Sequence, residues 1–347
     1  MLQVYVIPSF TFESGTTLEN VPVGFRSWGR LNHAADNVIV IGHSLTSDTN
    51  VAKWWERCIG SGRALDTDRY FVVCLNVIGS PYGSVSPVTI NPDTRRAYGA
   101  DMPQATVRDT VELHRVVLDR LGVRKVAFAI GGSMGGMQVL EWSFYGDYVR
   151  GLVPIGVGGR HSAWCIAWSE AQRQAIFADP TFRGGSYHPA RQPEAGLAAA
   201  RMIAMLSYRS FDSFEERFGR ERTNGAPDSP YLVEDYLHHH GEKLVRRFDA
   251  NCYVYLTRLM DSHDVSRGRG EYLDVLREIR QDTLVVGMES DVLYRPSEQR
   301  ELAENLPNAE LALLHAAHGH DTFLIEQKEL SDVVKTWRER TIDPHVL

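Results

Sequence analysis

The sequence GGSMGG at residues 131–136 decides the fold, together with the segments on either side of it. It follows KVAFAI at 125–130, an apolar run of strand length, and precedes MQVLEWSFYG at 137–146, a helical stretch. A G-x-S-x-G motif between a strand and a helix predicts a strained turn that exposes the Ser133 hydroxyl above the sheet. The helix that follows would point its first amides at a developing oxyanion. The alternative is a glycine-rich turn that carries an ordinary serine.

Around this motif, short apolar runs alternate with helical stretches. Runs of strand length occupy 38–42, 70–76, 126–130, 152–156, 283–287 and 310–314. Between the second and the third, apolar side chains recur at helical spacing over 107–121, and Gly122 ends that pattern. This alternation predicts βαβ units and therefore an α/β fold with a mostly parallel sheet.

The alternation stops between residues 161 and 271, which carry no convincing series of strands. Helical patterns cover 163–176, 194–208 and 231–258, and polar loops at 179–193 and 218–230 separate them. A chain of 347 residues would by length alone suggest about two domains. We instead expect one α/β core, formed by 1–160 and 272–347, that is interrupted by a helical lid insertion at 161–271.

A nucleophilic serine needs a base and a carboxylate that orients the base. In folds with this turn the order along the chain is serine, acid, histidine, each on a loop after a strand. Asp291 follows the strand at 283–288, and three histidines follow the next one, at 315, 318 and 320. His315 is close to the strand end, and His320 follows Gly319, where the chain can turn back. Position alone does not choose among the three.

Two histidine clusters raise the question of a metal site. The cluster at 315–320 has no acidic or cysteine ligands at a recognised spacing. The run at 238–240 lies in a helical stretch, where successive side chains point about 100° apart and do not converge easily on one ion. We therefore expect no metal.

A second oxyanion donor should come from the loop after the first core strand, GHSLTS at 42–47. The backbone amide of Leu45 or Thr46, together with that of Met134, could form the hole. An ordinary loop between strand and helix is an equal alternative from the sequence alone.

Composition excludes several classes of protein. The chain is 43% hydrophobic and 23% charged, and no apolar run approaches the roughly 18 residues of a membrane helix. The N-terminal residues do not resemble a signal peptide, and four widely spaced cysteines form no CxxC pair. We therefore expect a cytoplasmic protein that does not bind membranes. The net charge of −7 argues against a general nucleic-acid binder.

Longer motifs resemble those of the homoserine O-acetyltransferase family, acyltransferases of the α/β-hydrolase fold. The resemblance covers nearly the whole chain, and two segments, SPYGS at 80–84 and HSAWCIAWSEAQRQAI at 161–176, are closer to fungal-type members. Those members include serine O-acetyltransferase and deacetylcephalosporin C acetyltransferase. The other matching segments are FTFESGTTLENVPVGFRSWGRLN, GHSLTS, YGADMPQATVRDTVELHRVVLDRLGV, GGSMGGMQVLEW, RRFDANCYVYLTRLMDSHD, ESDVLYRPSEQ and HGHDTFL.

The resemblance implies a role for each candidate residue. It favours His320 as the base, with Asp291 as its partner and Ser133 as the nucleophile that takes an acyl group from acetyl-CoA. It also implies that Arg201 and Tyr208, seven residues apart and so on one helix face, meet the acceptor, and that Asp321 holds its ammonium group. No bound cofactor is implied, and members of the family form homodimers through the helical insertion.

The resemblance implies the transfer of acetyl from acetyl-CoA to L-homoserine in methionine biosynthesis, by a ping-pong mechanism. Serine or a larger hydroxymethyl compound as acceptor, and succinyl-CoA as donor, remain open at this point, as does an esterase of the same fold. A purely binding module would leave the turn and the triad without a use. Homoserine and serine differ by one methylene, which is worth only about 1–3 kcal/mol in a pocket.

Overall fold

An eight-stranded, mostly parallel sheet forms the centre of the computed structural model, which describes residues 1–226 and 228–346. The spatial order is β1-β2-β4-β3-β5-β6-β7-β8. β1 pairs antiparallel with β2, and β2 antiparallel with β4, whereas β3 to β8 are all parallel to one another. The predicted α/β fold and parallel sheet are thus confirmed. The strands are β1 (Gln3–Thr11), β2 (Thr17–Trp28), β3 (Val38–Gly42), β4 (Phe71–Leu75), β5 (Val126–Gly132), β6 (Val149–Ile155), β7 (Asp282–Met288) and β8 (Ala309–Leu314).

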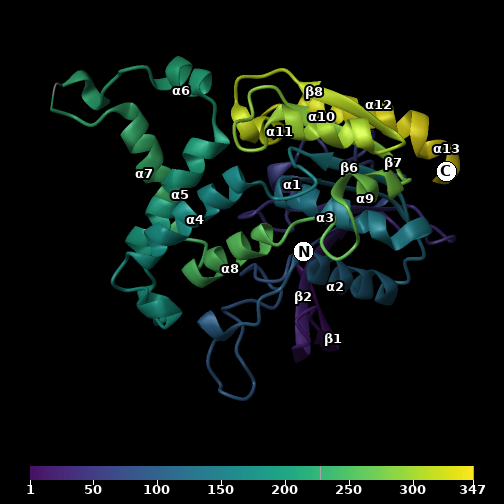
Figure 1. Ribbon diagram of the computed structural model, residues 1–347, viewed down its shortest axis with the longest axis horizontal. Coiled ribbons are helices and arrows are strands. Elements are labelled where there is room, and N and C mark those ends of the chain that lie inside the picture. Colours follow the sequence, from purple (N-terminus) through teal and green to yellow (C-terminus); the bar gives the residue numbers. More distant parts are fainter. Residues whose placement is uncertain (227, 347) are drawn as a thin grey trace.

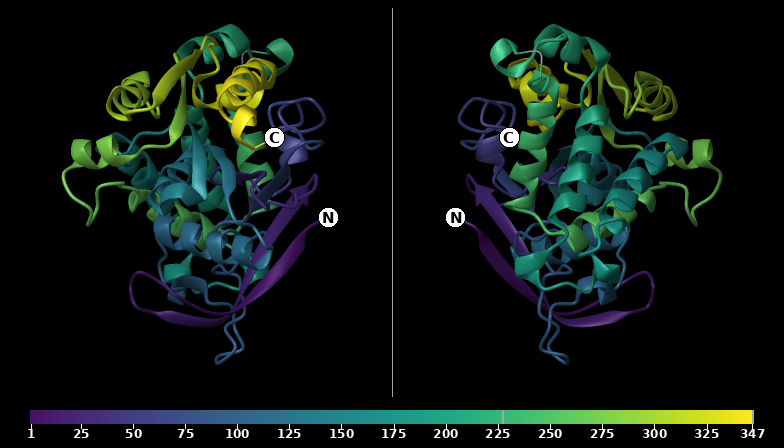
Figure 2. Two further views of the ribbon diagram at one scale, coloured as in Figure 1. Left: turned by 90° about the vertical axis from the view of Figure 1, so that its right-hand side faces the viewer. Right: turned by 90° about the vertical axis from the view of Figure 1, so that its left-hand side faces the viewer.

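The hairpin of β1 and β2 was not expected from the sequence. Figure 2 shows it as a long ribbon along one side of the molecule. Its apolar residues do not follow a simple alternation, because Val4 and Val6 are exposed on β1 whereas Ile7 and Phe10 are buried. Pro8 also lies within β1, which pairs with β2 alone and is an edge strand, where proline is tolerated.

Helices cover both faces of the sheet (Figure 1). Apolar residues of α2, α3, α9 and α10 belong to one large buried cluster, and those of α1, α11 and α12 belong to another. No helix of the described residues has both the length and the apolar character to cross a bilayer. The helices of the core are α1 (Val51–Trp54), α2 (Val107–Arg120), α3 (Met134–Trp142), α9 (Tyr272–Glu278), α10 (Pro296–Asn305), α11 (Thr322–Ile325), α12 (Gln327–Thr341) and α13 (Asp343–Val346).

Six α-helices of the described residues lie between β6 and β7, and the first five of them, α4 to α8, extend to one side of the sheet (Figure 1). These five are α4 (Ala163–Phe177), α5 (Glu194–Tyr208), α6 (Phe211–Phe218), α7 (Leu232–Val245) and α8 (Ala250–Asp261). The expectation of one helical stretch over 231–258 is wrong, because α7 ends at Val245 and α8 starts anew at Ala250. Asp249 causes this break, since it leaves helical geometry and its carboxylate caps α8 by accepting from the Cys252 amide at 3.0 Å.

Candidate active site

Ser133 lies at the turn between β5 and α3, and its backbone is strained. Its φ of 58° and ψ of −125° place a non-glycine residue in a conformation that is found mostly where function requires it. The turn brings α3 against β3 so closely that a Cβ on Gly135 would lie 2.1 Å from the carbonyl oxygen of Gly42. Only glycine at position 135 lets the helix begin where it does, which explains why the motif has a small residue two positions after the serine.

Asp291 and His320 form a buried acid–base pair beside this turn. Nδ1 of His320 lies 2.7 Å from Oδ2 of Asp291. The other carboxylate oxygen, Oδ1, accepts from the amides of Leu293 at 2.8 Å and Tyr294 at 3.0 Å. The loop after β7 therefore fixes the carboxylate through two amides, and the carboxylate fixes the imidazole. Nε2 of His320 is buried and has no hydrogen-bond partner among the described residues, so it can accept a proton.

The turn at Gly319 brings His320 back to the sheet. Gly319 has φ of 69°, and a Cβ there would lie 2.7 Å from the backbone of Arg209. Its amide donates to the Ser290 hydroxyl at 2.9 Å, and that hydroxyl donates to the carbonyl of Ala316 at 2.5 Å. Ser290 thus joins the loop that carries Asp291 to the loop that carries His320.

The other two histidines of this loop have different partners. Nδ1 of His315 lies 2.9 Å from the Glu289 carboxylate at the surface, and Nε2 of His318 lies 3.3 Å from Glu326. Of the three histidines left open by the sequence, His320 is the one that contacts Asp291. In the run at 238–240, His238 and His239 are exposed on α7, and His240 is half-buried with its ring centre 4.4 Å from that of Tyr236.

The loop after β3 places Leu45 next to Ser133, and both line the same cavity. Buried His43 shapes this loop, because its Nε2 accepts from the Val77 amide at 3.1 Å and its Nδ1 lies 2.9 Å from the Ser44 carbonyl. Burial lowers the pKa of His43, which keeps the ring neutral and able to accept that hydrogen bond. Met134 is the first residue of α3, so its amide has no helical carbonyl to bond to.

Arg201, Tyr208 and Asp321 meet at the mouth of this arrangement. The Arg201 guanidinium carbon lies 5.3 Å from the centre of the Tyr208 ring, and that ring lies 5.9 Å from His320. Asp321 follows His320 in a short helical turn at Gly319–Asp321, and its Oδ2 is 4.0 Å from Nη1 of Arg209. All three expected acceptor residues line one cavity with Ser133 and His320.

The charges of this cavity shift the pKa of its titratable groups. Burial disfavours the protonated form of His320, but the charge and hydrogen bond of Asp291 and the charge of Asp321 outweigh it and raise the pKa of His320. Burial has the opposite effect on Asp321 and raises its pKa, although the charges of Arg201, His320 and Arg209 oppose this effect. The cavity therefore holds a base with increased basicity, one cation and one carboxylate.

Two small cavities meet at Ser133. The outer one has about 60 Å³ and is lined by Ser44, Leu45, Thr46, Ser47, Ser133, Arg201, Tyr208, His320, Asp321, Phe323 and Leu324. The inner one has about 20 Å³ and shares Leu45, Ser133 and Tyr208 with the first. Its other lining residues are His161, Cys165, Trp168, Ser169, Gln172, Ser207, Met260, Leu293 and Tyr294.

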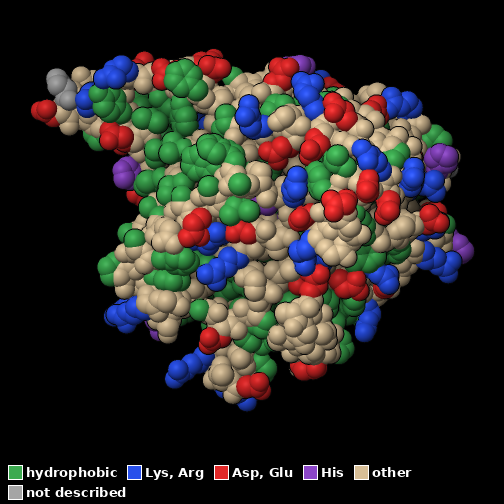
Figure 3. All heavy atoms as spheres, in the orientation of Figure 1, with side chains coloured by type: hydrophobic (Ala, Val, Ile, Leu, Met, Phe, Trp, Pro, Cys, Tyr) green, Lys and Arg blue, Asp and Glu red, His purple; other side chains and the backbone are tan. Residues whose placement is uncertain are grey.

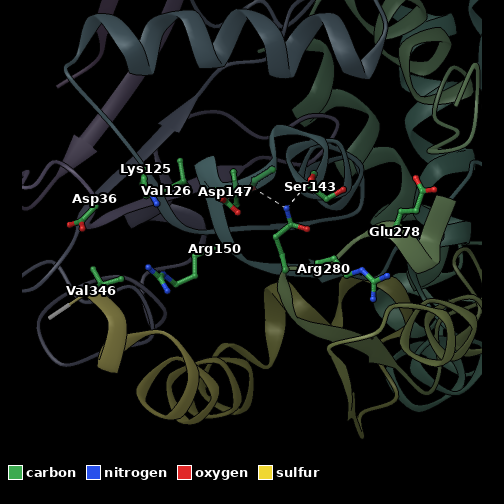
Figure 4. Close-up of a pocket in the computed structure, with 12 residues that line it drawn as sticks. Asp36, Lys125, Val126, Ser143, Asp147, Arg150, Glu278, Arg280 and Val346 are labelled. Carbon is green, nitrogen blue, oxygen red and sulfur yellow. Dashed lines mark hydrogen bonds between the residues drawn. The ribbon is translucent and has the colours of Figure 1, made fainter.

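A larger cavity, of about 460 Å³, lies at the opposite end of the sheet (Figure 4). Asp36, Lys125 and Gln281, which line it, come just before β3, β5 and β7, so it opens at the amino ends of the parallel strands. Ligands of open α/β sheets bind at the carboxyl ends. In Figure 4 the charged side chains around this cavity are spread apart and do not converge on one point. It is not the candidate active site.

Sequence reasoning missed several residues that build the site. Arg209 lies beside Asp321 and Tyr294 beside His320, and buried His43 shapes the loop that carries Leu45. Arg209 directly follows Tyr208, and Tyr294 lies three residues after Asp291. Closeness in the sequence to Tyr208 and Asp291 was the only sign of their role, since their contacts arise from tertiary packing.

Comparison with known proteins agrees with this geometry. Residues 37–324 match the α/β hydrolase fold family. A homoserine O-acetyltransferase of Salinibacter ruber is 61% identical over 97% of both chains.

Two solved structures superpose on the chain equally well. Esterase E22 is 26% identical, with a TM-score of 0.90 over 97% of this chain and 99% of its own. A homoserine O-acetyltransferase from Bacillus anthracis is 23% identical, with a TM-score of 0.91 over 99% of this chain and 98% of its own. At this identity the likeness shows the fold alone. The backbone therefore does not separate a transferase from an esterase, whereas the sequence match does. The chain belongs to the homoserine O-acetyltransferase family, acyltransferases built on the α/β hydrolase fold.

Proposed function

We propose that this chain transfers the acetyl group of acetyl-CoA to the hydroxyl of L-homoserine through an acetyl-Ser133 intermediate. The observation that carries this proposal is the pair of opposite charges, Arg201 and Asp321, in the cavity that holds Ser133 and His320. An esterase has no need for such a pair, whereas an amino-acid acceptor needs a cation for its carboxylate and an anion for its ammonium group. The identity of 61% with a homoserine O-acetyltransferase supports the same acceptor.

In the first half-reaction, Ser133 attacks the thioester carbonyl of acetyl-CoA. Nε2 of His320 takes the hydroxyl proton, and the amides of Leu45 and Met134 receive the oxyanion of the tetrahedral intermediate. The C–S bond then breaks, the proton on His320 passes to the sulfur, and CoA leaves. Asp291 keeps the imidazole oriented and stabilises its protonated form.

In the second half-reaction, homoserine occupies the space that CoA has left. Arg201 binds its carboxylate, Asp321 binds its ammonium group, and the ring of Tyr208 stacks beside them. His320 takes the proton of the acceptor hydroxyl, whose oxygen attacks the acetyl carbonyl. Oγ of Ser133 leaves with that proton, and O-acetylhomoserine is released for methionine biosynthesis. The reaction as written needs no group other than the two substrates.

The direct test is CoA release from acetyl-CoA in the presence of homoserine, serine or water alone. We expect fast turnover with homoserine, slower turnover with serine because its hydroxyl reaches one methylene less far, and slow turnover with water. Full turnover with water alone would make the protein a hydrolase and not a transferase, and preference for serine would move the proposal to serine O-acetyltransferase. Succinyl-CoA, tested in parallel, settles the donor.

We also propose that the helices at 161–271 act as a lid over the site and form a homodimer interface. Large apolar side chains are exposed there, among them Phe211 at 76%, Trp164 at 52% and Leu206 at 46%. Figure 3 shows hydrophobic side chains gathered over this side of the molecule. Patches of this kind mark interaction surfaces.

Size-exclusion chromatography with light scattering tests the dimer. Wild type should have the mass of two chains, and Phe211→Glu should shift it toward one. A monomeric wild type would refute the dimer and leave the catalytic proposal intact.

We also propose a cytoplasmic location for the protein. This location fits its four cysteines, which are all unpaired and buried.

A further inference from the structure

The inner cavity beside Ser133 has no role in the steps described so far. It has about 20 Å³, which is close to the smallest space that holds one water molecule. Its lining residues, apart from those it shares with the outer cavity, come from the helical segment and from the loops after β6 and β7. A space of this size beside the nucleophile admits one small group of the substrate.

The position of His320 decides which group this is. His320 lines the outer cavity and not the inner one. In the tetrahedral intermediate, the leaving sulfur of CoA and the attacking hydroxyl of the acceptor must both face His320, because it transfers their protons. The oxyanion faces the amides of Leu45 and Met134. The remaining substituent, the chain of the acyl group, then points to the side away from His320, which is the inner cavity.

The lining of the inner cavity contains no lysine, arginine, aspartate or glutamate. Burial lowers the pKa of His161 to about 3, so its ring is neutral. Most of the polar groups around it bond to other groups of the protein, and the exception is Nε1 of Trp168, which is buried and has no partner among the described residues. Tyr294 and Nδ1 of His161 are 3.1 Å apart, and the Gln172 side chain accepts from Tyr253 at 2.6 Å. The Ser207 hydroxyl donates to the Ala204 carbonyl at 2.8 Å. The wall therefore suits a methyl group, and to a carboxylate it offers no cation and only the neutral N–H of Trp168.

We propose that this inner cavity, closed on one side by Met260 of α8, is the acyl pocket and restricts the donor to acetyl-CoA. The proposal rests on the proposed function, in which Ser133 carries the acyl group. A propionyl or butyryl chain would collide with the wall to which Met260 contributes, and a succinyl chain would in addition bury a carboxylate without a cation beside it. Met260 is thus a specificity-determining residue.

Met260 is also the best position for a test. Leu293 lines the same cavity, but its amide holds Asp291, so changing it would disturb the triad. Met260 makes no hydrogen bond to the triad, and its side chain is 7% exposed. Met102 is 5% exposed, packs in the same large apolar cluster and lines neither cavity at Ser133, so Met102→Ala is a matched control.

The experiment measures the burst of CoA release without acceptor, using acetyl-, propionyl-, butyryl- and succinyl-CoA. This burst reports acylation of Ser133 alone, so it is informative even if the acceptor is not homoserine. Wild type should lose about 10- to 200-fold in acylation rate for each methylene added to acetyl. Met260→Ala should reduce its preference for acetyl over butyryl at least about 10-fold, through a faster butyryl reaction, and should still reject succinyl-CoA. Met102→Ala should keep the wild-type preference.

Three results would overturn the proposal. One is a wild type that is acylated by butyryl-CoA as fast as by acetyl-CoA. Another is a folded Met260→Ala with an unchanged preference. The third is a Met260→Ala in which hydrolysis of the acetyl-enzyme rises and the donor range does not, because the cavity would then hold the hydrolytic water. If Met260→Ala does not fold, Met260→Val is the second variant. It enlarges the cavity less than alanine does, so it should accept propionyl-CoA but still discriminate against butyryl-CoA. A wild type without any burst would refute the proposed function itself.

Discussion

Replacing Asp321 by asparagine tests how the acceptor is recognised. The substitution keeps the shape of the side chain and removes its charge. Asp321 lies in the cavity of Ser133, its carboxylate is 4.0 Å from Arg209, and its side chain is 21% exposed. If this carboxylate binds the ammonium group of homoserine, a charge-assisted hydrogen bond is lost, which is worth about 1.5–3 kcal/mol. Because the site is partly open to solvent, we expect a loss of about 2 kcal/mol, or roughly 30-fold in kcat/KM.

The assay compares homoserine with 4-hydroxybutanoate, which has the same hydroxyl and carboxylate but no ammonium group. Wild type should prefer homoserine, and Asp321→Asn should lose most of that preference, with the burst of CoA release unchanged. The rates are measured on the alkaline plateau, because the charge of Asp321 also raises the pKa of His320. Glu326→Gln, which removes a more exposed carboxylate near His318, is the control and should behave as wild type.

Two results would refute this reasoning. If Asp321→Asn slows both acceptors equally, the carboxylate acts on the chemistry or on the structure and not on the ammonium group. If the preference for homoserine persists, another residue binds that group. Thermal unfolding should accompany the kinetics, because Arg209 is buried and loses its partner in the variant.

Three further predictions concern other parts of the site. Arg201→Ala should raise the KM for homoserine and leave the burst with acetyl-CoA intact, and unimpaired acceptor kinetics would remove Arg201 from the site. Because Asp291 raises the pKa of His320, the acid limb of the pH profile of kcat/KM should lie above pH 6.5, the ordinary histidine value. Asp291→Asn should move that limb to lower pH and reduce kcat by about 10³- to 10⁴-fold. A limb that does not move would mean that a group other than His320 titrates. Gly135→Ala should destabilise the fold by about 3 kcal/mol, seen in urea unfolding, because the new Cβ meets the Gly42 carbonyl at 2.1 Å, and an unchanged midpoint would show that α3 can move away.

Local sequence was enough for the turn at Ser133. The strand before it, the helix after it and the glycines around it all lie within about 20 residues, and each constrains the same turn. The parallel strands β3 to β7 could be predicted for a similar reason, since buried strands are apolar along most of their length. The strands β1 and β2 were not predicted because exposed and buried residues are mixed along them without a regular alternation.

The positions of the three histidines along the sequence could not show that His320 is the one that contacts Asp291. His315, His318 and His320 lie within six residues of one another, and the difference arises from Gly319 and Ser290, which turn one ring toward Asp291. The break between α7 and α8 was equally hidden, because both helices present apolar residues at helical spacing and only the cap at Asp249 separates them. The resemblance to known sequences, and not periodicity, pointed to Arg201, Tyr208 and Asp321.

The central claim is that Ser133 carries the acetyl group from CoA to homoserine. Incubation with acetyl-CoA without acceptor, followed by digestion and mass spectrometry, tests it most directly. We predict one acetyl group on the peptide that contains Ser133, none in Ser133→Ala, and its loss on addition of homoserine with formation of an equal amount of O-acetylhomoserine. An unmodified Ser133, or an acetyl group that leaves no faster with homoserine than with water, would contradict the account.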